Sequence, residues 1–229
     1  MARRLADGLW LLDLGLVPPF ATNCYLVDDG EAVTLIDAGL PINYPSLATE
    51  LDRAGYERAD IDRVLFTHYD IDHVGGARAL RDHGVPMYMG ERDVDLVTGA
   101  WDPNLVHHKG LFHRIARRLF PLAGHDLRPI ADGETVGNFT AHHTPGHNPG
   151  HTVYTHEGLD AAFLGDLVWA TDGEFTTPFW LDSYEMRAVR ESAYAFARDH
   201  EFERGLAAHG EPVLTGAGDH LRAVTDEFW

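Results

Sequence analysis

The segment Thr67–Gly76 concentrates side chains that can bind metal ions. It reads THYDIDHVGG and places four candidate ligands within six residues: His68, Asp70, Asp72 and His73. Alternate residues of an extended loop point to the same side, so the side chains at 68, 70 and 72 can converge on one pocket. Imidazole and carboxylate groups hold divalent cations such as zinc, manganese or iron. The segment therefore predicts a metal centre.

The elements around this segment are suited to position such a centre. It follows the apolar strand predicted at Arg63–Thr67, and loops at the carboxyl ends of strands are where α/β folds build their sites. Gly75 and Gly76 are expected to let the backbone turn tightly into a helix over Val74–His83. Strands and helices alternate along the chain in two similar halves, which indicates an α/β sandwich with helices outside.

The segment resembles the signature of the metallo-β-lactamase superfamily, H-x-H-x-D-H followed by glycines. Four further motifs of that family occur in the expected order along nearly the whole chain. They are Ile36-Asp37-Ala38-Gly39, the run Thr144–His151, Gly165-Asp166 and Ala208-His209-Gly210. The resemblance implies a four-layer αββα sandwich and a hydrolase with two divalent metal ions, zinc being the first expectation.

The resemblance also assigns roles to individual residues. The predicted ligands of the first metal are His68, Asp70 and His147. Those of the second metal are Asp72, His73 and His209, and Asp166 bridges the two ions. Asp72 and Asp166 are also the residues expected to be catalytic. Asp37 is expected to orient the metal loop through backbone hydrogen bonds, and His151 to support the ligands from behind.

Asp70 departs from the family pattern, which has histidine at this position. Asp70 can coordinate as a carboxylate, or it can be too short to reach, which would leave His68 and His147 on the first metal. We favour coordination, and a carboxylate in place of an imidazole shifts preference from zinc toward manganese or iron.

A two-metal site of this kind implies hydrolysis by an activated water. Two cations would lower the pKa of a shared water toward ~7 and polarise the scissile carbonyl or phosphoryl oxygen. No side-chain nucleophile is required. Cys24 is the only cysteine, which excludes an intramolecular disulfide, and its apolar surroundings predict a core position.

The chain of 229 residues fits one domain, 1–229, with a helical insertion at about 99–128. In the insertion, helical spacing places Leu111, Phe112, Ile115 and Leu119 on one face. The insertion is basic within an acidic chain. Between Pro103 and Pro129 it carries five basic residues, Lys109, Arg114, Arg117, Arg118 and Arg128, against Asp126 alone.

Two functions compete for this insertion. In one, it is a lid with an apolar face over a site that hydrolyses a small ester, thioester or lactone. In the other, Lys109, Arg114, Arg117 and Arg118 guide RNA or DNA to the metals, and the enzyme is a phosphodiesterase or nuclease. We place the ester or thioester function slightly ahead, because the Thr-Pro-Gly-His motif resembles glyoxalase II-like and lactonase-like enzymes. A metal-binding interaction module without activity is a third and weaker hypothesis. An iron-dependent oxygenase of the persulfide dioxygenase kind is a further alternative, but it would need a single metal, and Asp166 with His73 and His209 argues for two.

The charge balance predicts the environment of the protein. Acidic residues number 36 and basic residues 18, for a net charge of −18, and Lys109 is the only lysine. An acidic, lysine-poor surface suits a cytoplasm rich in salt. No run of 18 apolar residues occurs, and Leu9–Leu14 is better explained as a strand than as an export signal. We therefore expect a cytoplasmic, halophilic protein without a membrane partner; the oligomeric state stays open.

Overall fold

Two β-sheets packed face to face form the centre of the protein in a computed structural model, which describes residues 1–15 and 21–228. The first sheet has seven strands in chain order, and its last four are parallel. These strands are β1 (Arg3–Ala6), β2 (Leu9–Gly15), β3 (Ala21–Asp28), β4 (Val33–Ile36), β5 (Arg63–Leu65), β6 (Pro86–Gly90) and β7 (Asp126–Ile130).

The second sheet has five strands in the order β14-β11-β10-β9-β8, and only β11 and β14 are parallel. Its strands are β8 (Thr135–Val136), β9 (Phe139–His143), β10 (Thr152–His156), β11 (Ala161–Gly165) and β14 (Arg204–Ala207). A small hairpin of β12 (Trp169–Thr171) and β13 (Glu174–Thr176) precedes the last helices.

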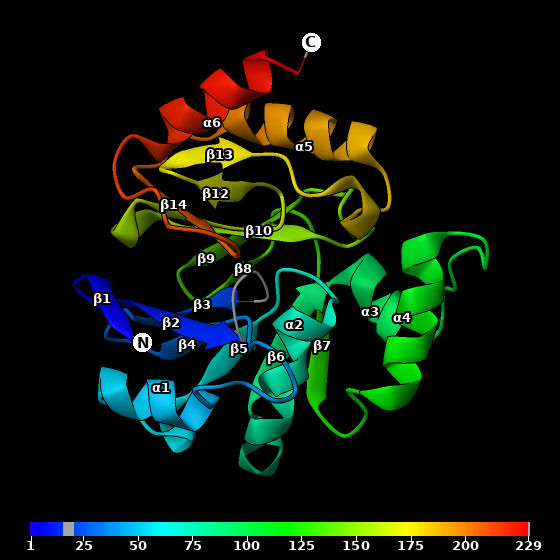
Figure 1. Cartoon of the computed structure of the whole chain (residues 1–229). Helices are drawn as coiled ribbons and strands as arrows, with labels where there is room; N and C mark the ends of the chain where they lie inside the picture. Colours follow the sequence, from blue (N-terminus) through cyan, green and yellow to red (C-terminus); the bar gives the residue numbers. More distant parts are fainter. Residues whose placement is uncertain (16–20, 229) are drawn as a thin grey trace.

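Helices cover the outer faces of both sheets (Figure 1). The helices on the first sheet are α1 (Leu47–Ala54), α2 (Ile71–Val74), the 3-10 helix η2 (Gly75–His83) and α3 (Glu91–Thr98). Those on the second sheet are α5 (Met186–Asp199) and α6 (Ala217–Asp226). Three short 3-10 helices, η1 (Arg58–Asp60), η3 (Glu157–Leu159) and η4 (Trp180–Asp182), lie in loops, and α4 (His108–Leu119) lies at one edge of the molecule.

The side chains of β2 show why the sheets and helices form layers. Leu12 and Leu14 pack under the helices of the first sheet, whereas Leu9 and Leu11 pack between the two sheets. Alternation along a strand buries both faces of the sheet in this way. A third core lies between the second sheet and α5 and α6. Three cores separate four layers, which confirms the αββα sandwich predicted from the sequence.

Most predicted elements are present, with shifted ends. The helix predicted over Val74–His83 is wrong in detail, because a single turn of α-helix ends at Val74 and continues as a 3-10 helix. Gly75 adopts ordinary helical backbone angles there. The two glycines serve close packing instead: a Cβ on Gly76 would lie 1.9 Å from the Ala38 carbonyl oxygen, and one on Gly75 2.3 Å from Pro41.

The insertion differs most from expectation. Residues 126–128, predicted as part of it, belong to β7 at the edge of the first sheet. The apolar face of α4 exists as predicted, but it is exposed. The opposite face is buried, and it carries Lys109, Gly110, His113 and Ala116.

Strand ends from both sheets meet at one edge of the sandwich. Asp37 follows β4 and the segment His68–His73 follows β5; Asp166 follows β11 and His209 follows β14. His147 comes from the loop between β9 and β10. Within residues 1–15 and 21–228, no helix has the length and apolar character needed to cross a membrane.

Candidate metal centre

Asp37 fixes the metal loop, the segment His68–His73, through hydrogen bonds at its start. Its Oδ1 accepts a hydrogen bond from the Thr67 backbone N–H at 2.9 Å, and its Oδ2 accepts from the Thr67 hydroxyl at 2.8 Å. The Nδ1 atom of His73 lies 2.8 Å from the same Oδ2. A carboxylate bound to one ring nitrogen orients the other toward a metal and makes it more basic. Asp37 therefore directs Nε2 of His73 into the site.

The four residues predicted around the second metal converge. The Oδ2 atom of Asp72 lies 3.6 Å from Nε2 of His73 and 3.6 Å from Nε2 of His209. The oxygens of Asp166 lie 3.8 Å from Nε2 of His73 and 3.5 Å from Nε2 of His209. Atoms bound to one tetrahedral metal at about 2.1 Å lie about 3.4 Å from one another. The spacing therefore matches a ligand set.

Three buried polar atoms at this place have no hydrogen-bond partner among the residues that the structure describes. They are Nε2 of His68, Nε2 of His73 and Oδ1 of Asp166. Leaving such groups unsatisfied costs about 1–3 kcal/mol each, so buried polar atoms in proteins normally have partners. A divalent cation beside His73 and Asp166 would satisfy the atoms of these two residues, so this part of the site fits a metal ion.

The charges of the site also favour a cation. Burial disfavours a charged imidazole, but Asp72 and Asp37 outweigh it and hold the pKa of His73 well above its usual value. Burial likewise opposes charge on His209, yet Asp166 raises the pKa of His209 to about 9. Protons on these two rings therefore balance the surrounding carboxylates, and a divalent cation can take over that balance when it displaces them.

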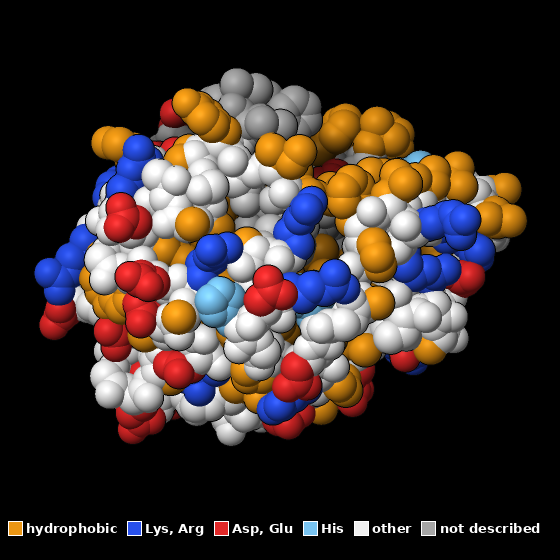
Figure 2. Space-filling model, turned by 90° about the horizontal axis from the view of Figure 1, so that it is seen from below, with side chains coloured by type: hydrophobic (Ala, Val, Ile, Leu, Met, Phe, Trp, Pro, Cys, Tyr) orange, Lys and Arg blue, Asp and Glu red, His pale blue; other side chains and the backbone are white. Residues whose placement is uncertain are grey.

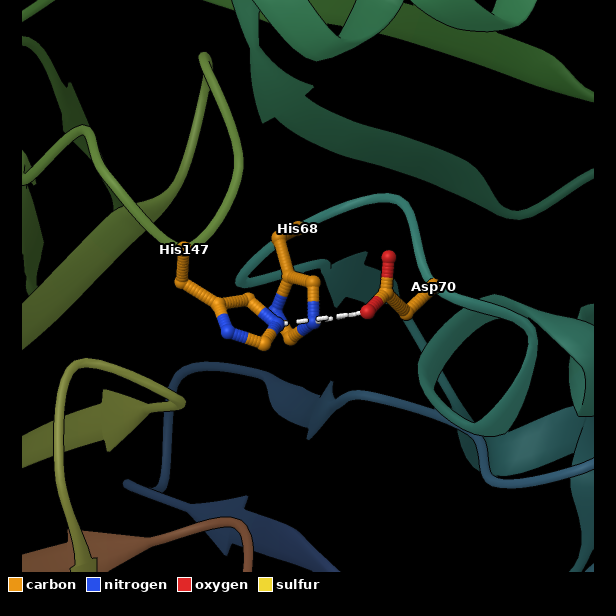
Figure 3. Close-up of side chains that lie close together, drawn as sticks. All are labelled: His68, Asp70 and His147. Carbon is orange, nitrogen blue, oxygen red and sulfur yellow. Dashed lines mark hydrogen bonds and ion pairs between the residues drawn. The ribbon is translucent and has the colours of Figure 1, made fainter. Parts of the chain in front are cut away.

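The residues predicted around the first metal also meet, as Figure 3 shows for His68, Asp70 and His147. The Oδ2 atom of Asp70 lies 3.4 Å from Nε2 of His68 and 3.2 Å from Nε2 of His147. All three side chains are buried. In position alone, these atoms could surround an ion.

A lysine from the insertion enters this first set. Nζ of Lys109 lies 2.8 Å from Oδ2 of Asp70 and 2.8 Å from Nε2 of His147. It also donates to the backbone carbonyl of Asp182 at 2.6 Å. Burial raises the pKa of a carboxyl group, but the Lys109 ammonium outweighs it and holds the pKa of Asp70 well below its usual range. Asp70 is therefore an ionised partner of a buried cation.

The other oxygen of Asp70 is occupied as well. Nε2 of His113 lies 2.7 Å from Oδ1, and the Asn148 amide donates to the same atom at 3.1 Å. His113 and Lys109 are four residues apart on α4 and so lie on the same helix face. Asp70 anchors the buried face of the insertion to the metal loop.

His151 links two of the candidate motifs. Its Nδ1 lies 2.8 Å from the Thr144 hydroxyl, and its Nε2 accepts from the backbone N–H of Asp166 at 3.0 Å. Burial and the neighbouring His147 lower the pKa of His151 well below its usual value, so the ring is neutral. His151 thus holds the backbone of Asp166 without reaching into the site.

The arginines proposed to contact substrate are placed away from the candidate ligands. Arg114 pairs with Asp102 at 3.0 Å, and Arg117 pairs with the same carboxylate at 2.8 Å. Arg118 is exposed. Of the four basic residues proposed for the substrate, the structure brings only Lys109 to the metal centre.

Several residues at the site were not identified from the sequence. Asp93, on α3, accepts from the backbone N–H groups of Tyr69 and Gly150 at 2.7 Å each, which ties the metal loop to the His147 loop. A single aspartate on a helix carries no signal of this role. The others are His113, Asn148, Asp182 and Ser183, whose Oγ lies 3.3 Å from Nδ1 of His147.

Two curated proteins illustrate what the chain is similar to. YobT of Bacillus subtilis is 34% identical over 136 residues, which cover 56% of this chain and 54% of that protein. Atrochrysone carboxyl ACP thioesterase of Aspergillus fumigatus is 29% identical over 174 residues, which cover 72% of this chain and 35% of that protein. The chain spans about half the length of these relatives or less.

Solved structures and a family model agree with the fold. TTHA1429, a metallo-β-lactamase family protein from Thermus thermophilus, has a TM-score of 0.75 at 21% identity, covering 98% of this chain and 79% of that one. TTHA1623 in a di-iron-bound form has a TM-score of 0.68 at 26% identity, covering 95% and 99%. The family model described as the metallo-β-lactamase superfamily matches residues 17–204. The chain therefore belongs to the metallo-β-lactamase superfamily, a family of metal-dependent hydrolases.

Proposed function

We propose that the protein hydrolyses an ester or thioester bond with the help of a metal ion held by Asp72, His73, Asp166 and His209. The observation that carries this proposal is the convergence of Asp72, His73 and His209, with the two oxygens of Asp166 beside the two histidines. Buried atoms of His73 and Asp166 there have no partner among the described residues. Two imidazoles and two carboxylates suit zinc, manganese and iron. Zinc is the usual choice for mixed nitrogen and oxygen ligands, and the di-iron form of TTHA1623 supports iron as the alternative.

The bound metal would supply an acidified water as nucleophile and a Lewis acid for the acyl carbonyl. The protein contributes fixed geometry. Asp37 holds the ring of His73, and His151 holds the backbone of Asp166, so both ligands are oriented before the metal binds. Asp166 offers one oxygen toward His73 and the other toward His209, and it therefore joins the two histidines into one set.

A cysteine nucleophile is not part of the proposal. The Cys24 side chain is fully buried, and burial followed by the nearby Asp37 raises the pKa of its thiol well above the usual value. A protonated, enclosed thiol is unreactive.

Apolar side chains around the insertion favour an acyl substrate. Figure 2 shows hydrophobic groups gathered on the side of the molecule where Figure 1 places α4. The loop at η4 exposes Phe179 and Trp180, and the same loop contacts Lys109 through the Asp182 carbonyl. The ring of Trp180 lies 6.2 Å from that of His108. One of the relatives is named atrochrysone carboxyl ACP thioesterase, which supports a thioester.

The phosphodiesterase alternative loses part of its basis. It depends on basic side chains that could track a phosphate backbone. Lys109 is buried against Asp70, and Arg114 and Arg117 are both paired with Asp102. Arg128 is paired with Asp126. Four of the five basic residues between Pro103 and Pro129 therefore already bind carboxylates of the protein.

A substrate panel tests the proposal. Metal-loaded protein is assayed on acyl thioesters, p-nitrophenyl esters, a lactone, bis-p-nitrophenyl phosphate and labelled RNA. We expect hydrolysis of thioesters or esters, its loss on chelation, and its return with added metal. Asp166→Ala should lose both the metal and the activity, whereas Asp172→Ala, at an exposed aspartate, should keep both. Activity confined to the phosphodiester substrates would favour the nuclease function.

A further inference from the structure

Lys109 is the only lysine in a chain whose other basic residues are all arginine, and it is buried with 3% of its surface exposed. The charged side chains of lysine, arginine, aspartate and glutamate are almost never fully buried unless they are paired. A composition that otherwise avoids lysine thus retains one at the candidate metal centre. Arginine cannot replace it there, because a planar guanidinium is wider than the compact point charge of an ammonium.

The ammonium of Lys109 is saturated by the protein. A lysine ammonium has three N–H donors and no acceptor. Nζ lies within hydrogen-bond distance of three acceptors: Oδ2 of Asp70, Nε2 of His147 and the carbonyl oxygen of Asp182. No donor is left for a substrate. Lys109 therefore positions Asp70 and His147, and its ammonium is surrounded by protein acceptors in the way that a bound cation would be.

This arrangement consumes the ligand atoms of the first metal. Nε2 of His147 lies 2.8 Å from Nζ of Lys109 and 3.2 Å from Oδ2 of Asp70, so side chains of the protein already surround it. Asp70 gives its Oδ2 to the same ammonium and its Oδ1 to His113 and Asn148. Of the ligands predicted for the first metal, His68 and the bridging Asp166 keep an atom without a partner among the described residues, and two protein ligands fall short of the three or four that hold a zinc ion in proteins.

We propose that the Lys109 ammonium takes the place of the first metal ion, so that the protein binds one metal, at Asp72, His73, Asp166 and His209. The inference shares that ligand set with the proposed function but concerns the number of ions and not the substrate. It differs from the two-ion expectation from the sequence.

The proposal also explains the departure at Asp70. A neutral histidine there would leave the buried ammonium with only the Asp182 carboxylate, 3.9 Å from Nζ, as a counter-charge, and a poorly paired buried charge destabilises a protein. An aspartate supplies that counter-charge, and His113 on the same helix face completes its hydrogen bonds. Asp70 and Lys109 therefore belong together. The Asp70 carboxylate stands where the family has a histidine, because the Lys109 ammonium stands where the family has the first metal ion.

Counting bound metal tests the proposal directly. Full-length protein is stripped with chelator, loaded with excess Zn²⁺ or Mn²⁺, desalted and subjected to elemental analysis. Wild type is expected to hold one equivalent. The double variant Lys109→Ala/Asp70→His removes the ammonium and restores the family ligand, and it should hold two. Arg118→Ala removes an exposed positive charge from the same helix, and it should hold one, as wild type does.

Two equivalents in the wild type would overturn the proposal, whatever the variants do. One equivalent in a folded double variant would also count against it, because the ammonium would then not be what excludes the second ion. If the double variant does not fold, the wild-type count still decides. The metal count is independent of hydrolysis: one ion with no esterase or thioesterase activity rejects the proposed function alone, and two ions with such activity reject this inference alone.

Discussion

Nζ of Lys109 lies 2.8 Å from Nε2 of His147, so a side chain of the insertion contacts the nitrogen that a metal ligand would use. The contact joins α4 to a loop between β9 and β10, 38 residues later in the chain. It makes the insertion part of the metal centre and not merely a cover over it. The exposed apolar face of α4 then remains free for other contacts.

Asp37→Asn should weaken metal binding while the fold is kept. Asparagine tolerates the left-handed backbone of Asp37, φ 57°, but it lacks the charge that orients His73. Loss of such a supporting carboxylate reduces metal affinity about 10- to 100-fold. The dissociation constant, measured by competition with a chromogenic chelator, checks this. Asp172→Asn, at an exposed aspartate with φ 53°, is the control and should bind metal as wild type does.

Trp180→Ala should impair binding of substrates with long apolar acyl groups. Trp180 is more than half exposed, at 59%, on the loop that contacts Lys109 through Asp182. Losing part of its apolar contact costs on the order of 1 kcal/mol, or about five-fold in KM. KM should rise for a long acyl thioester and stay constant for an acetyl thioester, with metal content unchanged. Equal effects on both substrates would exclude an acyl-binding role for Trp180.

How much of the site could be predicted depends on how far apart its residues lie in the sequence. The ligands within His68–His73 are neighbours in one loop, so their types and spacing indicated a metal centre. The partners of Asp70 come from α4 and could not be predicted, because nothing local records that Lys109 and His113 pack against it.

The prediction of the fold has the same limit: sequence patterns predict local elements but not how distant elements pack. Helical spacing correctly placed Leu111, Phe112, Ile115 and Leu119 on one face of α4. Periodicity identifies a face but does not say which side is buried. Here the polar face is buried, because the charge on Asp70 is satisfied by Lys109 and His113. The sandwich itself was predictable, since alternating apolar strands and amphipathic helices have few other ways to pack.

Acid should destabilise the protein through His142. Burial, and next the neighbouring His200, whose ring lies 4.2 Å away, lower the pKa of His142 to about 4. An unfolded histidine has a pKa of about 6.5. Between these values the unfolded chain binds more protons, so the stabilisation is complete above pH 6.5 and is lost as the pH falls toward 4.

The melting temperature measured at pH 7 and pH 5 checks this assignment. His142→Gln should lose less than the wild type between the two values, because glutamine does not titrate. His143→Gln, at the adjacent half-buried histidine, should lose as much as the wild type. If His142→Gln and the wild type lose the same amount, the acid sensitivity has another source.

Salt should raise the melting temperature. With 36 acidic and 18 basic residues, the folded chain repels itself in dilute buffer. The Debye length falls from about 30 Å at 0.01 M to about 3 Å at 1 M, which screens this repulsion. A melting temperature that is flat up to molar KCl would show that the acidic surface is not an adaptation to salt.

Anomalous diffraction from crystals of wild-type protein soaked in excess Zn²⁺ or Mn²⁺ tests the central claim most directly, because it locates each ion among named side chains. The account predicts one anomalous peak, bounded by Asp72, His73, Asp166 and His209, with Lys109 remaining against Asp70 and His147. A second peak of comparable height among His68, Asp70 and His147, with Lys109 displaced, would contradict it.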